Sequence, residues 1–471
     1  MRKTKIICTI GPACEDEKTL KEMCRAGMNV ARLNFSHGTH AEHARRIETI
    51  CRVREELDLP IAILLDTRGP EYRIRTFRDG RVCLEAGQTF TFTTDQSVVG
   101  DETRVAVSYE NLTADLAPGD RILVNNGLLE FRVEKLTERE AVCTVLEGGE
   151  LSDRKSMAFP GKVLNQPYLS DQDRADLLFG VEHGVDFVAC SFVSRKQDLL
   201  DVRSFLDAHG GADIDLIAKI ENRSGVNEID CICDACAGVM VARGDLGVEI
   251  PYAELPAIQK HLIDRCRMRG KRVITATEML ESMITNIRPT RAEISDVANA
   301  VYDGSSAIML SGETAAGRHP VQAVEAMASI AVCTEESIHY DRRFTRTEFP
   351  THSVVDALSH ATCGMAIDIG AKAIAVCTIS GMTARMVSRF RPPMDILGLT
   401  TSERTLRKLA LSWGVTPVRC EIFHSTDVLF YTAKKLAQQT FGLQPGDRIV
   451  LTGGLTNGTS GNTDLLKVET V

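Results

Sequence analysis

The sequence predicts an α/β protein built on a (β/α)8 barrel, with a small β-barrel domain inserted as a lid and an α/β domain at the C-terminal end. Three observations lead to this fold. Over residues 1–340, eight short apolar runs alternate with segments of helical period. After the third run, the period changes to short alternating stretches as far as residue 168. From about residue 345, a new alternation of strands and helices begins.

The eight apolar runs are the candidate barrel strands, and helical segments separate most of them. The strands are expected at residues 5–10, 28–34, 61–66, 186–192, 215–221, 238–243, 272–277 and 306–311. The helices are expected at residues 17–26, 41–57, 171–183, 196–209, 254–269, 291–303 and 320–335. A closed parallel (TIM) barrel needs this pattern, because helices cover the outer face of strands that are buried on both sides. A doubly wound open sheet shares the alternation, but the count of eight strands favours the barrel.

The interruption after the third strand predicts a separate β domain. Short alternating stretches are expected as strands at residues 89–93, 103–107, 121–124, 129–133 and 141–146, with Pro-Gly and Gly-Gly turns between some of them. This pattern indicates a small antiparallel domain over residues 70–167, inserted where it can act as a lid over a site. The barrel would then occupy residues 1–69 and 168–344.

The remaining residues, 345–471, predict a second α/β domain. Strands are expected at residues 373–378, 396–400, 416–419, 448–452 and 466–470. Helices are expected at residues 353–368, 384–390, 403–411 and 425–441.

Composition narrows the function before any motif is considered. The 471 residues carry 55 Lys and Arg against 64 Asp and Glu, a net charge of −9, which argues against nucleic-acid binding. No apolar stretch approaches the roughly 18 residues of a membrane span, so no membrane association is expected. The 15 cysteines are unevenly spaced and mostly lie in apolar runs. Buried, reduced thiols in the cytoplasm are therefore favoured over disulfides or a zinc site.

Polar residues gather where the predicted barrel strands end, which is where barrel enzymes build their active sites. Lys219 and Glu221 stand two apart, so both point to the same side of their strand. Glu221 and Asp245 follow adjacent strands, and two neighbouring carboxylates repel unless a cation joins them. Oxygen-only ligands favour Mg²⁺ or Mn²⁺. Arg32, Arg73, Lys219 and Arg243 add positive charge beside this acidic pair, so the site suits a phosphorylated or carboxylated anion.

Two further clusters leave alternatives open. Asn34, Ser36, Asp66 and Thr67 offer a single carboxylate, which suits either a monovalent cation or a plain hydrogen-bond network. The stretch at residues 378–383 follows a strand and precedes a helix, so it could cradle a phosphate or could be an ordinary helix cap. The glycine-containing stretch at residues 452–461 could cover the same ligand or form an ordinary turn.

The strand-end motifs resemble those of the pyruvate kinase family along essentially the whole chain. They are TKIICTIGP at residues 4–12, MNVARLNFSHG at 28–38, LDTRGPE at 65–71, KIEN at 219–222, MVARGDLGVEI at 240–250, TATEMLESM at 275–283, RPTRAE at 288–293, DVAN at 296–299 and MLSGETA at 309–315. The resemblance implies transfer of a phosphoryl group from phosphoenolpyruvate to ADP, giving pyruvate and ATP in glycolysis. It also implies a regulatory C-terminal domain and a homotetramer.

The same resemblance implies a role for individual residues. Glu221 and Asp245 would hold Mg²⁺ or Mn²⁺, while Lys219 would stabilise the charge that builds on the phosphoryl group and enolate. Arg32 would hold the substrate phosphate. The substrate would also contact Gly244, Asp245 and Thr277, with Thr277 near the path of the proton to the enolate, and K⁺ would be bound by Asn34, Ser36, Asp66 and Thr67. The nucleotide would be bound by Asn34, His37, Arg73 and Lys155. A sugar-phosphate or nucleotide effector would be bound by Thr378, Ser380, Gly381 and Thr383.

The chain also departs from the family pattern at several positions. The residues that differ from the usual ones are Arg68, Asn125, Asn126, Ser156, Ala158, Glu278 and Ala316. Glu71 matches the residue that accompanies K⁺ dependence in the family.

Two other functions are also compatible with the sequence. The altered lid allows a non-catalytic metabolite sensor, and the carboxylate pair alone allows another Mg²⁺-dependent barrel enzyme, such as an aldolase or lyase.

Overall fold

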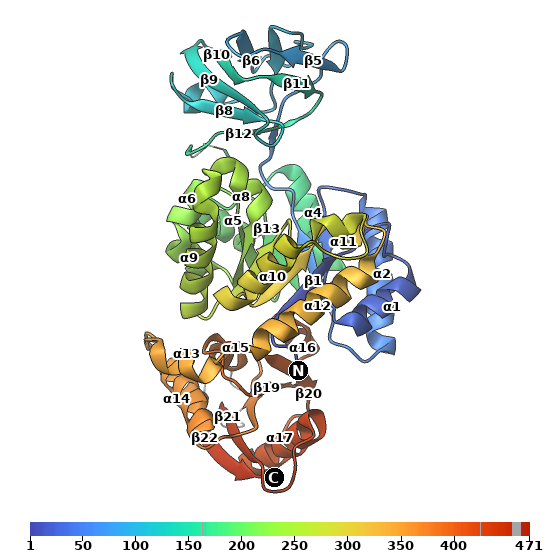
Figure 1. Cartoon of the computed structure of the whole chain (residues 1–471), viewed down its shortest axis with the longest axis vertical. Coiled ribbons are helices and arrows are strands. Elements are labelled where there is room, and N and C mark those ends of the chain that lie inside the picture. Colours follow the sequence, from blue (N-terminus) through green and yellow to red (C-terminus); the bar gives the residue numbers. More distant parts are fainter. Residues whose placement is uncertain (163, 165, 424, 455–462) are drawn as a thin grey trace.

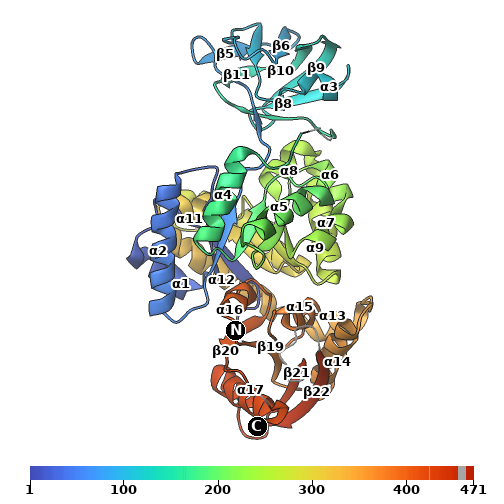
Figure 2. The same ribbon diagram turned by 180° about the vertical axis from the view of Figure 1, so that it is seen from behind.

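The computed structural model describes residues 1–162, 164, 166–423, 425–454 and 463–471. Figure 1 shows three bodies stacked along the long axis of the molecule, with the inserted β sheets at one end, the barrel in the middle and the C-terminal α/β sheet at the other end. The same arrangement is seen from behind in Figure 2. The described part of the chain holds no helix long and apolar enough to cross a membrane.

The central body is a closed barrel of eight parallel strands, which confirms the barrel over the open sheet. Its order is β1-β17-β16-β15-β14-β13-β3-β2. The strands are β1 (Lys5–Thr9), β2 (Val30–Asn34), β3 (Ala62–Asp66), β13 (Phe187–Cys190), β14 (Asp215–Ile220), β15 (Gly238–Ala242), β16 (Arg272–Ala276) and β17 (Ala307–Leu310). Each strand lies within the range that the sequence predicted.

Helices surround the barrel, and several begin at side-chain caps that the sequence supplies. They are α1 (Glu17–Ala26), α2 (His40–Glu56), α4 (Asp171–Glu182), α5 (Lys196–Ala208), α6 (Arg223–Asn227), α7 (Ile229–Ala235), α8 (Arg243–Glu249), α9 (Leu255–Met268), α10 (Arg291–Asp303), α11 (Gly312–Ala315) and α12 (Pro320–Glu336), with 3-10 turns η1 (Tyr252–Glu254) and η2 (Glu281–Ile284). The side chains of Thr39 and Thr290 each accept a hydrogen bond from the backbone N–H of the third residue of the helix. Each forms a capping box, which fixes the start of α2 and of α10.

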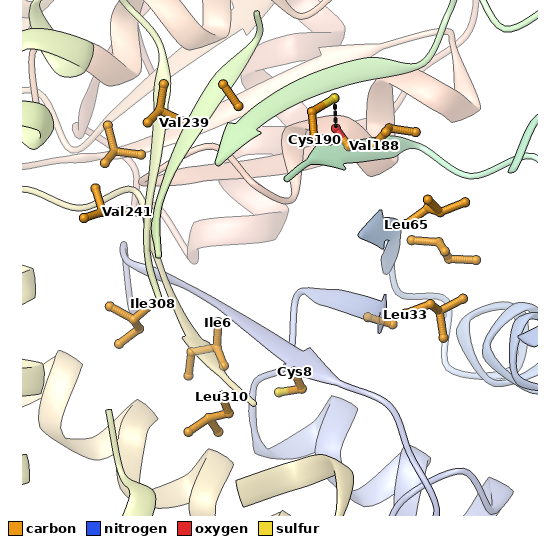
Figure 3. Close-up of a cluster of buried hydrophobic side chains, with 14 of the residues drawn as sticks. Ile6, Cys8, Leu33, Leu65, Val188, Cys190, Val239, Val241, Ile308 and Leu310 are labelled. Carbon is orange, nitrogen blue, oxygen red and sulfur yellow. Dashed lines mark hydrogen bonds between the residues drawn. The ribbon is translucent and has the colours of Figure 1, made fainter. Parts of the chain in front are cut away.

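Alternation along each strand separates two hydrophobic layers. Residues at one parity point outward and pack beneath the helices, as Figure 3 shows for Ile6, Cys8, Leu33, Leu65 and their neighbours. Residues at the other parity fill the barrel interior, among them Ile7, Val30, Leu64, Ile217 and Met240. Because residues two apart share a side, the interior rows continue upward into the polar residues at the strand ends.

The insertion folds into a seven-stranded sheet of order β4-β12-β8-β9-β10-β6-β7 and a two-stranded sheet of β11 and β5. Its elements are β4 (Tyr72–Arg73), β5 (Arg81–Leu84), β6 (Thr89–Thr93), β7 (Arg104–Ala106), α3 (Leu112–Asp115), β8 (Arg121–Val124), β9 (Leu129–Leu136), β10 (Glu140–Glu147), β11 (Gly149–Ser152) and β12 (Ser156–Ala158). A bridge between Ile74 and Val107 joins the two edge strands, so the sheet curls toward a barrel. The prediction of a wholly antiparallel domain was wrong in one place, because β6 and β7 pair in parallel.

The C-terminal body is a five-stranded sheet of order β20-β19-β18-β21-β22, with only β22 antiparallel to its neighbour. Its elements are α13 (Tyr340–Arg346), α14 (Val354–Asp368), β18 (Ala373–Cys377), α15 (Met382–Arg389), β19 (Asp395–Thr400), α16 (Glu403–Leu409), β20 (Val415–Arg419), α17 (Thr426–Phe441), β21 (Arg448–Gly454) and β22 (Thr463–Thr470).

The C-terminal body docks on the barrel end where the strands begin. Leu411 is fully buried against the interior layer of the barrel. Arg407 pairs with Asp186 at 2.8 Å, and Lys408 pairs with Asp215 at 2.9 Å. The opposite end, where the strands finish, is therefore left to face the inserted sheets (Figure 1).

Candidate active site

Five polar side chains lie at the carboxyl ends of adjacent barrel strands, directly above the apolar side chains that face the barrel interior. Thr9 and Asp66 are the last residues of β1 and β3, and Arg32 lies two residues before the end of β2. Ser191 directly follows β13, and Lys219 lies one residue before the end of β14. Each continues a row whose lower members are apolar interior residues, such as Ile7 below Thr9 and Ile217 below Lys219. All five are buried, so their charges and hydroxyls act on one another with little screening by water.

Asp66 is the centre of this group. Its Oδ2 lies 2.6 Å from Nε of Arg32, and its Oδ1 lies 3.1 Å from Nζ of Lys219. Arg32 also donates from Nη1 to the Thr9 hydroxyl at 2.9 Å. Burial would raise the pKa of Asp66, but Arg32 and Lys219 together lower it below its ordinary value. The carboxylate is thus ionised and holds two cations in fixed positions.

Lys219 is clamped from three sides. Its Nζ lies 3.0 Å from Oε1 of Glu221 and donates to the Ser191 hydroxyl at 2.6 Å, in addition to its pair with Asp66. Burial by itself would lower the pKa of Lys219, but the two carboxylates reverse this effect and raise it. The side chain is therefore a permanent, immobile positive charge at the barrel mouth.

Glu221 is fully buried, and one of its oxygens is left for a further ligand. Oε2 accepts from the backbone N–H of Phe192 at 2.6 Å, and Phe192 adopts the left-handed conformation with φ of +57°. Oε1 receives no hydrogen bond from any described residue, in spite of its ion pair with Lys219. Burial raises the pKa of Glu221 to about 7; Lys219 opposes that shift and Asp245 adds to it.

Asp245 stands in the first turn of α8, close enough to Glu221 to affect its pKa, and is exposed. Two carboxylates supply oxygen ligands of the kind that Mg²⁺ accepts together with waters and substrate oxygens. Within the described residues, no group of three or more His, Cys, Asp or Glu side chains is arranged to hold a metal ion. A cation bound by Glu221 and Asp245 would take its remaining ligands from neutral oxygens, such as those of substrate and water.

Thr277 and Gly244 meet beside this pair. The Gly244 N–H donates to Oγ1 of Thr277 at 2.8 Å, and that hydroxyl donates to the Ala276 carbonyl at 2.6 Å. Thr277 has φ of +67°, an unusual conformation for a β-branched residue. Buried Arg243 holds it there, because Nη2 donates to the Thr277 and Glu278 carbonyls at 2.6 and 3.1 Å.

The possible monovalent-cation residues also come together. Asn34 and Asp66 are register partners on β2 and β3, and the Ser36 N–H donates to Oδ1 of Asn34 at 3.1 Å. Thr67 is tied to β13, since its hydroxyl accepts from the Ser191 N–H at 3.2 Å. Four oxygen-bearing side chains therefore surround the ends of two adjacent strands.

A cavity of ≈330 Å³ separates the barrel mouth from the inserted sheets. Arg73, Lys155 and Asp245 line it, whereas Asn34 and His37, which the structure also describes, lie outside its lining. Arg73 donates to Glu71 at 2.6 Å and to the Arg154 carbonyl at 2.7 Å. The structure thus brings two of the four predicted nucleotide-binding residues to one cavity.

The altered lid residues lie on the same cavity. Asn125 and Asn126 both have positive φ, 56° and 55°, a conformation that Asn tolerates in a hairpin turn. Asn126 also accepts a hydrogen bond from the Ser156 hydroxyl at 3.1 Å. The asparagines therefore fit the turn, and they present no charge to the cavity.

Glu249 is a further carboxylate on this cavity. It lies four residues after Asp245 on α8, and therefore on the same helix face. The backbone N–H of Phe159, at the end of the lid, donates to it. Burial nevertheless raises the pKa of Glu249 to about 7, because this single hydrogen bond does not offset the loss of water.

The predicted effector residues Thr378, Ser380 and Gly381 lie in the turn between β18 and α15, and Thr383 lies in the first turn of α15. The Gly381 N–H donates to the Thr378 hydroxyl at 3.0 Å, and Gly381 has φ of +79°. Thr383 is buried and shares a hydrogen bond of 2.6 Å with Thr463 of β22, while Ser380 is exposed. Residues 455–461 of the predicted glycine-containing segment lie outside the described residues.

Sequence reasoning gave no role to Ser191 or Glu249 and did not predict the contacts of Arg243. Arg243 was expected to add charge to the mouth, but it holds the Thr277 loop and pairs with Asp296 at 2.7 Å. The interior parity of β13 could have identified Ser191, which lies two residues after Ala189. The four-residue spacing from Asp245 could have identified Glu249.

The closed barrel, with a buried cation at its mouth and a β domain inserted after its third strand, defines a protein of the TIM-barrel class with a site suited to an anion. Comparisons with known proteins agree. The description "Pyruvate kinase, barrel domain" matches residues 1–324, and "Pyruvate kinase, alpha/beta domain" matches residues 356–469. The chain belongs to the pyruvate kinase family. It transfers the phosphoryl group of phosphoenolpyruvate to ADP, giving pyruvate and ATP, which is the glycolytic reaction of that family.

Individual relatives are similar over the whole chain. A pyruvate kinase of Clostridium perfringens is 44% identical over 474 residues and covers all of both chains. One from Staphylococcus saprophyticus is 46% identical, covering all of this chain and 81% of the relative. A crystal structure of a pyruvate kinase from Cryptosporidium parvum matches with a TM-score of 0.94 and 37% identity, covering 100% of this chain and 96% of that one. The family generally depends on Mg²⁺ and K⁺.

Proposed function

We propose that phosphoryl transfer takes place at the barrel mouth, with Arg32 binding the substrate phosphate and Lys219 stabilising the charge that develops during transfer. The observation that carries this proposal is the buried ammonium of Lys219, fixed 3.1 Å from Asp66 and 3.0 Å from Glu221. A cation that is already in place needs no reorganisation as charge moves onto the phosphoryl oxygens and the enolate. Such a group binds the transition state more tightly than the substrate.

Glu221 and Asp245 would hold Mg²⁺ or Mn²⁺. The buried Oε1 of Glu221 receives no hydrogen bond, and Asp245 presents its carboxylate to the cavity from the start of α8. When bound, the cation would neutralise phosphoryl oxygens and orient them. The rest of its coordination would come from substrate and water.

Thr277 would place its hydroxyl near the path by which a proton reaches the enolate, with the Gly244 backbone beside it. The support for this role is the strained backbone of Thr277, because left-handed β-branched residues cluster at functional sites. Arg243 would act as a positioning residue, since it holds the Thr277 carbonyl and not the substrate.

Asn34, Ser36, Asp66 and Thr67 would bind K⁺ with one carboxylate and several neutral oxygens. A monovalent cation suits this set, because a single carboxylate shared with Arg32 and Lys219 leaves too little negative charge for a divalent ion. Glu71, which forms an ion pair with Arg73, would accompany a dependence of activity on K⁺.

The nucleotide would bind between barrel and lid. Arg73 and Lys155 already line the cavity, and closure of the lid domain over residues 70–167 would bring them toward Asn34 and His37 of the barrel. The barrel over residues 1–69 and 168–344 would be the catalytic domain. Uncharged Asn125 and Asn126 would then face the phosphates of ADP without repelling them.

The C-terminal domain, residues 345–471, would be regulatory. Thr378, Ser380, Gly381 and Thr383 would bind the phosphate of a sugar phosphate or nucleotide at the turn before α15. We also infer a homotetramer, because the family usually forms one, and a cytoplasmic location, because the family's reaction is glycolytic. Analytical ultracentrifugation and cell fractionation would test these two points.

Mn²⁺ binding followed by electron paramagnetic resonance tests the metal assignment. We expect Glu221→Gln and Asp245→Asn each to weaken Mn²⁺ binding by about tenfold or more, because each removes a charged ligand. Asp207→Asn on the exposed face of α5 is the matched control and should bind Mn²⁺ as the wild type does. Unchanged affinity in both site variants would refute the assignment.

A further inference from the structure

A second pocket lies between the barrel and the C-terminal domain, away from the candidate active site. Six cationic side chains line it, three from each side: Arg267, Lys271 and Arg272 from the barrel, and Arg385, Arg389 and Arg391 from the C-terminal domain. Three serine residues and Trp413 also line it, and none of the described lining residues is Asp or Glu. In a chain with a net charge of −9, such a purely basic lining needs an explanation.

Only half of these cations have a carboxylate partner. The paired ones are Arg272 with Asp215 at 3.0 Å, Arg389 with Asp356 at 3.3 Å and Arg267 with Asp264 at 3.1 Å. Among the described residues, Lys271, Arg385 and Arg391 form no ion pair. Lys271 donates to the Cys236 carbonyl at 2.8 Å, and Arg385 donates to the Met382 sulfur at 3.3 Å. Three of the six cations therefore face the pocket with no carboxylate of the described residues within ion-pair distance.

Arg391 is the most deeply placed of the cations that have no ion pair among the described residues. It is 5% exposed and donates only to neutral oxygens, those of Ser388, Gly304 and Ser306. Within the part of the chain that the structure describes, its Nε has no hydrogen-bond partner, and neither has Nε of Arg389. Burial lowers the pKa of Arg391 to about 9 and Arg267 lowers it further, while Tyr340 and the Glu335 carboxylate, which forms no ion pair with Arg391 within the described residues, only partly oppose the shift. A buried guanidinium without a counter-ion is unfavourable, and an anion would offset that cost.

We propose that this pocket binds a small inorganic oxyanion of the phosphate class, which joins the barrel to the C-terminal domain. Guanidinium groups match the oxygens of a tetrahedral anion, and the serine hydroxyls can donate to them as well. The enclosed part of the pocket is ≈10 Å³, room for about one water molecule. The partly exposed side chains of Arg267, Lys271 and Arg385 must therefore move outward as the anion enters.

The chain carries its own reporter for this site. Trp413 is its single tryptophan, lines the pocket, and lies 4.6 Å from the guanidinium of Arg391. Inorganic phosphate would be titrated into the full chain at constant ionic strength, with chloride as the balancing anion, while tryptophan fluorescence is recorded. We expect a saturable change in fluorescence and a higher melting temperature at saturation, because a ligand that binds only the folded state stabilises it.

Two variants tie the response to the pocket. Arg385→Gln and Lys271→Gln each remove an unpaired, partly exposed cation, and we expect about tenfold weaker phosphate binding in each. Arg342→Gln, on the exposed surface of α13, should titrate as the wild type does. Melting in chloride alone would check that the variants fold. A fluorescence response that is unchanged in both variants would overturn the proposal, as would an equal response to chloride.

Discussion

Nζ of Lys219 lies 3.1 Å from Oδ1 of Asp66, although strand β13 separates the strands that carry them. Ser191 bridges the gap from β13, receiving a hydrogen bond from Lys219 at 2.6 Å and donating one to Asp66 at 3.3 Å. This contact follows from strand parity, because both residues continue interior rows of the barrel. The barrel thus places a fixed cation where a phosphorylated substrate can meet it.

Arg243 should control the geometry of Thr277. Arg243→Met removes the donors that hold the Thr277 and Glu278 carbonyls, so the strained backbone can relax. We expect kcat to fall by about tenfold to a hundredfold with a smaller change in KM, because the Thr277 hydroxyl is displaced and no substrate contact is removed.

Steady-state kinetics with phosphoenolpyruvate as the varied substrate would measure kcat and KM separately for the wild type and for the variant. Arg243→Lys should recover part of kcat, since its ammonium can reach at least one carbonyl. A loss confined to KM in Arg243→Met would mean that Arg243 binds substrate and is not a positioning residue.

The Asn34, Ser36, Asp66 and Thr67 cluster should make turnover depend on K⁺. Replacing K⁺ by tetramethylammonium should lower kcat by about tenfold or more, because the large cation cannot enter a site lined by small oxygen ligands. Ser36→Ala should raise the K⁺ concentration that gives half-maximal activity, while exposed Ser204→Ala on α5 should not. Equal rates in the two salts would exclude a K⁺ role for the cluster.

Glu249 should make stability depend on pH. Its pKa is raised by burial from 4.5 to about 7, so between these values the folded chain holds a proton that the unfolded chain has released. Its contribution to stability therefore falls as pH rises through this window. Gln does not titrate, so Glu249→Gln should melt progressively higher than the wild type from pH 5 to about pH 8.

Calorimetry over this pH range would measure the difference in melting temperature. Glu182→Gln on the exposed face of α4 is the control and should melt in parallel with the wild type. A constant offset between Glu249→Gln and the wild type at all pH values would show that Glu249 does not titrate in this range.

The regular parts of the fold could be predicted because they depend on local periodicity. The barrel strands and the inward parity of Lys219 and Glu221 follow from alternation along single strands. The parallel pairing of β6 and β7 could not be predicted, since it depends on contacts between short edge strands. The role of Arg243 was equally hidden, because its partners at Thr277, Glu278 and Asp296 lie more than thirty residues away.

Formation of pyruvate by Lys219→Met is the most direct test of the assigned site. Wild type and variant would be assayed with phosphoenolpyruvate, ADP, Mg²⁺ and K⁺, with Lys435→Met on the exposed face of α17 as the matched control. We expect Lys219→Met to lose at least about a thousandfold in kcat while it still binds Mn²⁺, because the lost interaction belongs to the transition state. Turnover within about tenfold of the wild type would contradict the role of Lys219 and the site built around it.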